Sequence, residues 1–344
     1  MRGGAGFAGA PVSSQYTRWP VRNSVLTRVE RRRPRRRRRA PVALLLVAVL
    51  AGAGVVAFRH FDTRTTPAAA ASPKATGVRP VHTTPPAAPV RLLSAARPLH
   101  GRPRVSARSA ILVDGDTGRV LWEKAPHRRR PIASTTKIMT ATLVLERLPL
   151  DRVVKVPAAA VRTPLVREGL RRGERVPAWK LLDGLLIFSG NDDAYALAAA
   201  AAGTKPRFVK LMNEKARALG LRDTHFTSVS GVVDKGNYSS AWDLAALTRY
   251  ALRDARFRQT VAMKIAHVRW SAPTFAKVYV NKNQLLRSYR GTDGVKTGWT
   301  TLAGHCLVAS AHRGGRGLIA VLLHSGNPYR DARRLLNLGF SRSG

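Results

Sequence analysis

The chain has 344 residues, of which 44% are hydrophobic, so it is long enough for one large domain or two ordinary ones with a packed core. Its 60 lysines and arginines outnumber 19 acidic residues. The formal net charge of +41 favours binding to polyanions such as nucleic acid, anionic lipid or an acidic cell wall. No zinc-finger spacing, RNA-recognition aromatic pair or basic stripe with interleaved aromatics is present, so we predict no nucleic-acid partner. The single cysteine, Cys306, excludes an intramolecular disulfide and a CxxC site, and its apolar surroundings predict a core strand.

The first hundred residues divide into three segments by composition. Residues 1–40 form a basic tail that ends in RRRPRRRRRA, and residues 41–58 carry no charged side chain. These 18 apolar residues behind a basic cluster predict a membrane-inserting segment, with the N-terminus inside the cell and the rest outside. A retained single-pass anchor is preferred, and secretion after signal cleavage at small residues such as 51–53 is the alternative. Residues 59–104, rich in Pro, Ala, Thr and Arg, predict an extended linker.

A folded catalytic domain is expected over residues 105–344. The stretch SARSAILVDGDTGRVLWEKA predicts a β-hairpin that turns at residues 114–118. Apolar residues then recur at spacings of three and four, which predicts helices over residues 134–148, 177–189, 192–202, 205–220 and 240–254. Strands return over residues 304–325 before a closing helix at residues 330–339. Strands at both chain ends with helices between them predict an α+β fold, with one sheet built from both ends and an all-helical lobe.

The first polar motif is Ser134-Thr135-Thr136-Lys137. Positions i and i+3 share one face of a helix, so the Lys137 ammonium can reach the Ser134 hydroxyl. A serine becomes nucleophilic when a neighbour takes its proton, and a lysine can do so when burial and nearby positive charge lower its pKa. Taken alone, the pattern is more typical of an N-cap serine beside a surface lysine.

The second motif is Ser189-Gly190-Asn191, where two predicted helices meet at a loop. The hydroxyl can relay a proton to a departing amine, and the asparagine amide can bind a substrate carbonyl and steady the lysine. Taken alone, this triplet is typical of a turn that caps the next helix, because Ser, Gly and Asn suit turns.

The third motif is Lys296-Thr297-Gly298, at the start of a predicted strand. An ammonium and a hydroxyl that project together suit the binding of a carboxylate through charge-assisted hydrogen bonds. The glycine lets a ligand backbone approach closely. The alternative for this motif is an edge lysine beside a β-turn.

The three motifs in this order match the SxxK, SDN and KTG set of active-site-serine penicillin-recognising enzymes. From about residue 104 to residue 340 the chain resembles the low-molecular-weight penicillin-binding proteins that act as serine-type D-alanyl-D-alanine carboxypeptidases. Segments such as ILVDGDTGRVLWEKA, LLIFSGNDDA and AGHCLVASA carry this resemblance. It implies the β-lactamase/DD-peptidase fold with an antiparallel sheet, removal of the terminal D-alanine from peptidoglycan stem peptides, and covalent inhibition by β-lactam antibiotics. Neither a metal nor a cofactor is expected.

The resemblance also assigns catalytic roles by position. Ser134 is expected to attack the carbonyl between the last two D-alanines and form an acyl-enzyme, with Lys137 as the general base. Ser189 and Asn191 are expected to manage proton transfer and bind the substrate backbone.

Four residues on the third motif are expected to bind substrate. Lys296 and Thr297 are expected to hold the terminal carboxylate, with Gly298 and Trp299 beside them. The oxyanion is expected between the main-chain amides of Ser134 and Trp299.

One stretch departs from the family pattern, and three alternatives remain open. Residues 228–233, SVSGVV, replace an Asn-Pro-His-Gly-Leu stretch, which leaves the shape of that loop open but affects none of the catalytic roles assigned above. A serine β-lactamase would share all three motifs, but the ExxLN signature of class A is absent between Asn191 and Lys296. A DD-endopeptidase would differ only in the shape of its pocket. A non-catalytic wall-binding homologue would be expected to have lost the serine or a lysine, whereas all are present.

Overall fold

The computed structural model describes residues 90–94, 103–232, 235–269 and 276–341. The predicted basic tail and the predicted membrane segment at residues 41–58 lie outside these ranges. Among the helices of the described ranges, none combines the length and the apolar composition needed to cross a membrane.

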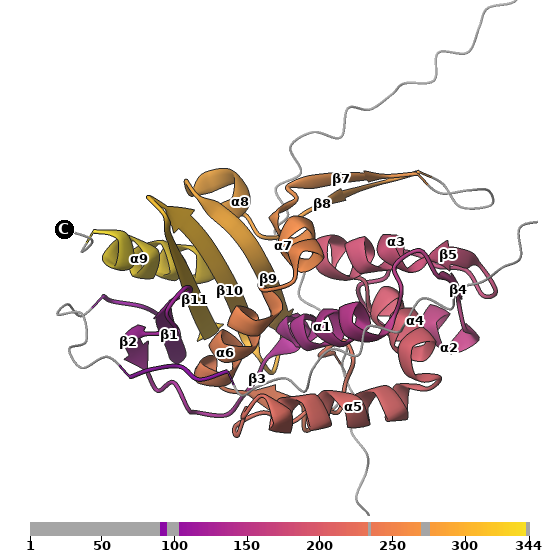
Figure 1. The fold of residues 1–344 in the computed structure, drawn as a ribbon, viewed down its shortest axis with the longest axis horizontal. Helices are drawn as coiled ribbons and strands as arrows, with labels where there is room; N and C mark the ends of the chain where they lie inside the picture. The colour runs from indigo at the N-terminus through magenta and orange to yellow at the C-terminus, as the bar shows by residue number, and fades with distance from the viewer. Residues whose placement is uncertain (1–89, 95–102, 233–234, 270–275, 342–344) are drawn as a thin grey trace, which may run out of the picture. The chain divides into compact units, whose positions relative to one another are not determined.

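An antiparallel five-stranded sheet joins the early and late parts of the described chain (Figure 1). Its strands, in the spatial order β2-β1-β11-β10-β9, are β1 (Ser109–Asp114), β2 (Val120–Lys124), β9 (Thr292–Thr300), β10 (Gly304–Arg313) and β11 (Arg316–Ser325). β1 pairs with β11 from Ser109 opposite Leu323 to Asp114 opposite Leu318. The predicted α+β fold, with one sheet built from distant parts of the chain, is confirmed.

Helices cover both faces of this sheet, which explains why β1, β10 and β11 are buried along most of their length. On one side, α9 (Pro328–Phe340) packs onto β10 and β11 through Leu335 and Leu336. The other side is covered by α6 (Ala241–Ala251) and α7 (Ala255–Ala262). Cys306 lies in β10 with 2% of its surface exposed, and burial raises the pKa of its thiol to about 11, so its predicted place in the core is confirmed.

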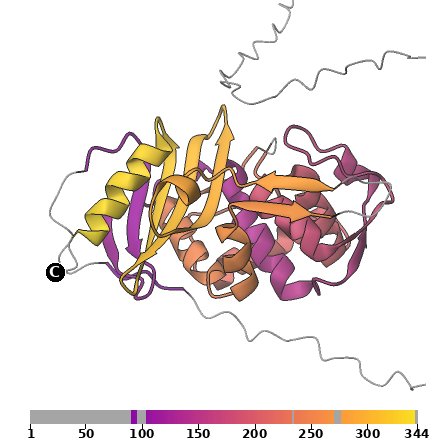
Figure 2. The ribbon, with the colours of Figure 1, turned by 90° about the horizontal axis from the view of Figure 1, so that it is seen from above.

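The second part of the fold is the helical lobe, which lies at the opposite end of the folded part from α9 (Figure 2). Its elements are α1 (Lys137–Arg147), β4 (Val153–Lys155), α2 (Ala158–Val161), β5 (Arg175–Pro177), α3 (Ala178–Asp183), the π-helix η2 (Gly184–Phe188), α4 (Asn191–Ala202) and α5 (Lys205–Ala218). The prediction of an all-helical lobe is wrong in one respect, because β4 and β5 form a short antiparallel ladder.

Short elements connect these two parts. They are β3 (Arg130–Pro131), η1 (Ala133–Thr136), β6 (Tyr238–Ser239), β7 (Ile265–Val268), β8 (Lys277–Val280) and α8 (Leu285–Ser288). β3 pairs with β6, and β7 pairs with β8. These short ladders were not predicted from the sequence.

One part of the predicted linker, residues 90–94, lies among the residues that the structure describes. Val90 and Leu92 are 7% and 8% exposed and belong to the main hydrophobic core. The main-chain N–H of Leu93 donates to the Gly118 carbonyl at 2.9 Å, and the N–H of Val120 donates back to Leu93 at 2.8 Å. Residues 90–94 therefore belong to the folded part.

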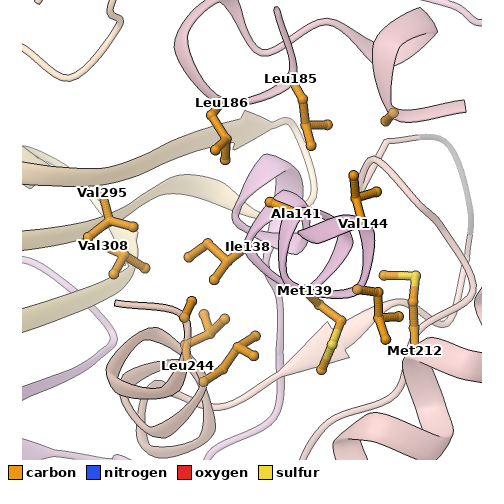
Figure 3. Close-up of a cluster of buried hydrophobic side chains, with 14 of the residues drawn as sticks. Ile138, Met139, Ala141, Val144, Leu185, Leu186, Met212, Leu244, Val295 and Val308 are labelled. Atoms are coloured by element: carbon orange, nitrogen blue, oxygen red, sulfur yellow. The ribbon is translucent and has the colours of Figure 1, made fainter. Parts of the chain in front are cut away.

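Helix α1 runs through the main core, where its side chains meet both the sheet and the lobe (Figure 3). Ile138 on α1 is fully buried and faces Val295 of β9 and Val308 of β10 (Figure 3).

We expect Ile138→Ala to lower the free energy of unfolding by about 2–5 kcal/mol, because the lost side-chain carbons leave a cavity. Urea unfolding followed by circular dichroism measures this free energy. The control is Arg147→Ala at an exposed position on the same helix, which should change the free energy of unfolding by less than about 0.5 kcal/mol. Equal losses in the two variants would contradict the central position of α1.

Candidate active site

Ser134 lies on the short 3-10 helix η1, directly before α1. Ala133 has a φ of 46°, in the left-handed region, so the chain turns sharply just before Ser134. The Thr136 hydroxyl donates to the Ala133 carbonyl at 2.9 Å and closes the turn. The sequence predicted Ser134 within the α-helix. The structure places it on the tighter turn that leads into the helix, where it remains within reach of Lys137.

Lys137 is fully buried beneath Ser134 and has three oxygen neighbours. Its Nζ lies 3.0 Å from Ser134 Oγ, 2.8 Å from Asn191 Oδ1 and 3.1 Å from the Ser230 carbonyl. A neutral amine has two N–H donors and one lone pair. In that state Lys137 can donate to Asn191 and Ser230 while its lone pair accepts the proton of Ser134.

The second motif brings Ser189 and Asn191 into the same site. Ser189 ends the π-helix η2 with a φ of 74°, a left-handed conformation that is uncommon outside glycine and clusters at functional sites. Asn191 begins α4, and its Nδ2 donates to the Pro164 carbonyl at 2.8 Å. This bond leaves the Asn191 Oδ1 facing Lys137, which it contacts at 2.8 Å.

The third motif lies in the middle of β9, whereas the sequence predicted it at the start of a strand. Lys296 is 2% exposed, and its Nζ donates to Ser189 Oγ at 2.9 Å and to the Thr297 carbonyl at 3.1 Å. Two serine hydroxyls therefore each lie within hydrogen-bonding distance of a buried lysine, Ser134 of Lys137 and Ser189 of Lys296.

Gly298 and Trp299 follow on β9 next to η1. A β-carbon at position 298 would lie 2.8 Å from the Ser134 main-chain nitrogen, so glycine is required for β9 to pack against η1. The sequence had explained this glycine by the approach of a ligand, but the close neighbour is the chain itself. Trp299 is 48% exposed, and its ring centre lies 6.3 Å from that of His305.

Burial and charge set the protonation of the two lysines. Burial, reinforced by the positive charge of Lys282, lowers the pKa of Lys137 to about 7, while Asp193 and Asp192 oppose the shift. Burial also lowers the pKa of Lys296 well below its usual value, and the charges of Lys137 and Lys282 act in the same direction. Each lysine therefore reaches its neutral form at a lower pH than an exposed lysine would.

Asp192 and Asp193 hold the start of α4 in place. Asp192 accepts the main-chain N–H groups of Glu168 and Gly169, each at 3.0 Å, and so fastens that segment to the helix. Asp193 is fully buried, and burial together with the nearby Glu168 raises the pKa of its carboxyl well above the usual range. A β-carbon at Gly190 would lie 1.9 Å from Asp193 Oδ2, so the glycine of the second motif makes room for this carboxyl.

The sequence analysis assigned no role to residues 228–232, although they form part of the site. The Ser230 carbonyl is one of the three oxygens around Lys137. The Thr140 hydroxyl donates to the Val229 carbonyl at 2.6 Å and holds this segment against α1. A main-chain acceptor has no residue-type signature, so the sequence carried no signal for it.

Comparison with known proteins gives consistent matches. The Peptidase_S11 family model, described as D-alanyl-D-alanine carboxypeptidase, matches residues 96–327. The chain is 36% identical over 245 residues to the D-alanyl-D-alanine carboxypeptidase DacF of Bacillus subtilis, a match that covers 69% of this chain and 62% of that protein. It is also 36% identical over 263 residues to the D-alanyl-D-alanine carboxypeptidase of Streptomyces sp. strain K15, covering 70% of this chain and 89% of that one. The chain thus spans less than two thirds of the Bacillus relative.

Solved structures agree with these sequence matches. The crystal structure of the Streptomyces K15 DD-transpeptidase is similar with a TM-score of 0.66 and 35% identity, covering 70% of this chain and 99% of that one. A D-alanyl-D-alanine carboxypeptidase from Mycobacterium tuberculosis gives a TM-score of 0.67 and 32% identity, covering 72% and 96%. The matched segment contains the three motifs and the lysines that contact both serines. The chain therefore belongs to the Peptidase_S11 family of D-alanyl-D-alanine carboxypeptidases.

Proposed function

We propose that this protein is a serine D-alanyl-D-alanine carboxypeptidase that removes the terminal D-alanine of peptidoglycan stem peptides through an acyl-enzyme on Ser134. The observation that carries the proposal is the buried Lys137, whose Nζ lies 3.0 Å from Ser134 Oγ and whose pKa is lowered to about 7. A lysine of that kind can act as a base near neutral pH, which an exposed lysine cannot.

Acylation begins when neutral Lys137 takes the proton of the Ser134 hydroxyl. The Ser134 oxygen attacks the carbonyl carbon between the two D-alanines, and the negative charge on the carbonyl oxygen is received by the main-chain N–H groups of Ser134 and Trp299. The C–N bond then breaks, and the proton that Lys137 took from Ser134 passes to the departing amine by way of Ser189, whose Oγ lies 2.9 Å from Lys296 Nζ. D-alanine leaves, and the rest of the peptide remains as an ester on Ser134.

Water then attacks the ester and releases the shortened peptide, with the proton returned to Ser134. Asn191 supports both steps, because its Oδ1 accepts a hydrogen bond from Lys137 at 2.8 Å and fixes the amine. Lys296, Thr297 and Gly298 lie on β9 beside η1, where the first two supply the cation and the hydroxyl for the terminal carboxylate.

The direct test is D-alanine release from a diacyl-L-lysyl-D-alanyl-D-alanine peptide by the full-length protein, with and without penicillin. We expect release that penicillin abolishes. An amino acceptor such as glycine is included in a parallel reaction, because the similar Streptomyces K15 protein is named a DD-transpeptidase. Hydrolysis of penicillin without D-alanine release would instead indicate a β-lactamase, and no reaction with either compound would contradict the proposal.

The rate of acylation is expected to depend on the protonation of Lys137. Only the neutral amine can take the Ser134 proton, so kcat/KM should be low below the Lys137 pKa, rise as the pH passes about 7, and then reach a plateau. The charged groups that set this midpoint are Lys282, Asp192 and Asp193. Measurement of kcat/KM from pH 5 to pH 9 checks this, and an acid limb centred near pH 4 would contradict Lys137 as the base.

The proposal includes a cellular location for the protein. Residues 1–40 would be a cytoplasmic tail, residues 41–58 a membrane anchor and the residues that follow a spacer, with the catalytic domain at residues 105–344 outside the cytoplasm. The apolar run behind the arginine cluster supports this arrangement, as does a substrate in the cell wall. Fractionation of cells expressing the full chain should recover it with the membrane, and a chain without residues 41–58 should remain in the soluble cytoplasmic fraction.

A further inference from the structure

Residues 184–190, called here the Ser189 turn, close on a single carbonyl. The main-chain N–H groups of Ser189 and Gly190 both donate to the Gly184 carbonyl, at 2.8 Å and 3.1 Å. The first bond links positions i and i+5, the pattern of a π-helix, and Ser189 takes its left-handed φ of 74° where the turn ends. The distance of 2.9 Å between Ser189 Oγ and Lys296 Nζ therefore depends on how this turn is held.

The carboxyl group of Asp193 packs against both ends of the Ser189 turn. A β-carbon at Gly184 would lie 2.6 Å from Asp193 Oδ1, and a β-carbon at Gly190 would lie 1.9 Å from Asp193 Oδ2. Both distances are shorter than real β-carbons show, so glycine at these two positions leaves room for the carboxyl. Asp193 lies in the first turn of α4 and is fully buried. Its side chain therefore supports the turn that orients Ser189.

Glu168 reaches the same place as Asp193. A β-carbon at Gly184 would also lie 2.6 Å from Glu168 Oε2, so the carboxyl groups of Glu168 and Asp193 are neighbours. The Tyr279 hydroxyl donates to Glu168 Oε2, and Lys277 Nζ lies 3.5 Å from Glu168 Oε1. Within the described part of the chain, both side-chain oxygens of Asp193 lack a hydrogen-bond partner. Because buried polar atoms nearly always have one, a proton between the two carboxyl groups would supply what Asp193 lacks.

Burial also favours a retained proton on this pair. The Glu168 side chain is 1% exposed and Asp193 is fully buried, so two negative charges here would repel each other with little screening. Burial raises the pKa of the Glu168 carboxyl, and burial together with the nearby Glu168 raises the pKa of Asp193 well above its usual range. The other charged and titratable groups that act on the pair are Asp192 on α4, Lys137 on α1, and Lys277 and Tyr279 on β8. The pair therefore keeps at least one proton at neutral pH.

We propose that Glu168 and Asp193 are positioning residues that share a proton and so hold the Ser189 turn in the shape that Ser189 needs to pass a proton to the departing amine. This inference rests on the function proposed above. With the shared proton in place, one carboxyl donates to the other, and the pair carries a single negative charge beside Lys277. Both carboxyl groups then stay against the turn without repelling each other. The shared proton remains on the pair throughout the reaction, and Ser189 is the residue that transfers protons.

The activity test compares the full-length protein with Asp193→Ala, Asp193→Asn and, as a matched control, Asp151→Ala in the exposed turn that follows α1. The substrates are diacyl-L-lysyl-D-alanyl-D-alanine and the same peptide ending in D-lactate. The nitrogen of D-alanine must be protonated to leave, whereas the oxygen of D-lactate depends less on a proton. We expect Asp193→Ala to lower kcat/KM about tenfold for the peptide and less than about threefold for the D-lactate ester.

The conservative variant separates the hydrogen bond from the charge. The amide of Asp193→Asn has the size of the carboxyl and can donate to Glu168 in place of the shared proton. We expect Asp193→Asn to recover most of the peptide rate that Asp193→Ala loses. Asp151→Ala should change the rate with neither substrate.

The shared proton is tested through the pH dependence of stability. Above the ordinary carboxyl pKa the unfolded chain has released this proton, while the folded pair keeps it. A rise in pH therefore favours the unfolded state of wild type, and Asp193→Asn has no such proton to lose. Between about pH 5 and pH 7 we expect the equilibrium constant of unfolding, measured in urea, to rise about tenfold per pH unit more in wild type than in Asp193→Asn.

The outcomes separate this inference from the proposed function. Equal slowing of both substrates by a folded Asp193→Ala, no slowing of either, or no recovery in Asp193→Asn would overturn the positioning role. Parallel pH dependence of unfolding in wild type and Asp193→Asn would overturn the shared proton, and this comparison decides the inference if Asp193→Ala does not fold. A wild-type protein that releases no D-alanine would overturn the proposed function and the positioning role with it, and the unfolding curves would still decide the shared proton.

Discussion

Ser134→Ala is expected to abolish D-alanine release, with kcat at least about a thousandfold lower, because removal of the nucleophile ends covalent catalysis. The hydroxyl of Ser134 contacts Lys137 and lies on a turn that neighbouring residues close, so the fold should remain. D-alanine release and circular dichroism on the same samples measure the two effects separately.

The control for this variant is Ser288→Ala, which removes a serine hydroxyl from the exposed end of helix α8. Its rate of D-alanine release should stay within about twofold of wild type, since substitutions on the surface and away from the active site have small effects. Retention of D-alanine release by a correctly folded Ser134→Ala would mean that another group is the nucleophile.

Lys137→Arg is expected to lower the rate of acylation at least about a hundredfold, which is the usual contribution of a positioned general base. A guanidinium keeps its proton throughout the accessible pH range, so the variant cannot take the proton of Ser134. Acylation by a fluorescent penicillin between pH 6 and pH 10 measures this. Wild type should gain activity through about pH 7, and the variant should gain none.

The matched control is Lys210→Arg, the same replacement at an exposed position on α5. We expect its acylation rate to equal that of wild type. If Lys137→Arg kept a rate within about tenfold of wild type, Lys137 would be a positioning residue and the base would be a different group.

Much of the sheet and the helical lobe could be predicted because their signals are local. The hairpin of β1 and β2 and the paired strands β10 and β11 show β-strand runs joined by glycine turns, and the longer helices show apolar spacings of three and four. The spacing of Ser134 and Lys137 likewise predicted their contact, since it depends only on the geometry of one turn. The short ladders β3–β6, β4–β5 and β7–β8 were missed because strands of two to four residues are too short to show a period.

The features that the sequence could not indicate depend on contacts between distant segments. The carbonyl of Ser230 reaches Lys137 across 93 positions in sequence, and a residue of any type would offer the same main-chain acceptor. The π-helix η2 is composed of GLLIF, whose apolar pattern suits an α-helix equally well, so the conformation that turns Ser189 toward Lys296 was not visible in the sequence.

Identification of the acylated residue tests the central claim most directly. The full-length protein is incubated with penicillin G, and the adduct is located by intact-mass measurement followed by peptide mapping. Because the hydroxyls of Ser134 and Ser189 lie 3.0 Å and 2.9 Å from the Nζ of a buried lysine, both are chemically plausible nucleophiles, and the experiment distinguishes them. We predict one penicilloyl group per chain, on the peptide that contains Ser134. An adduct on Ser189, or none on either serine, would contradict the account.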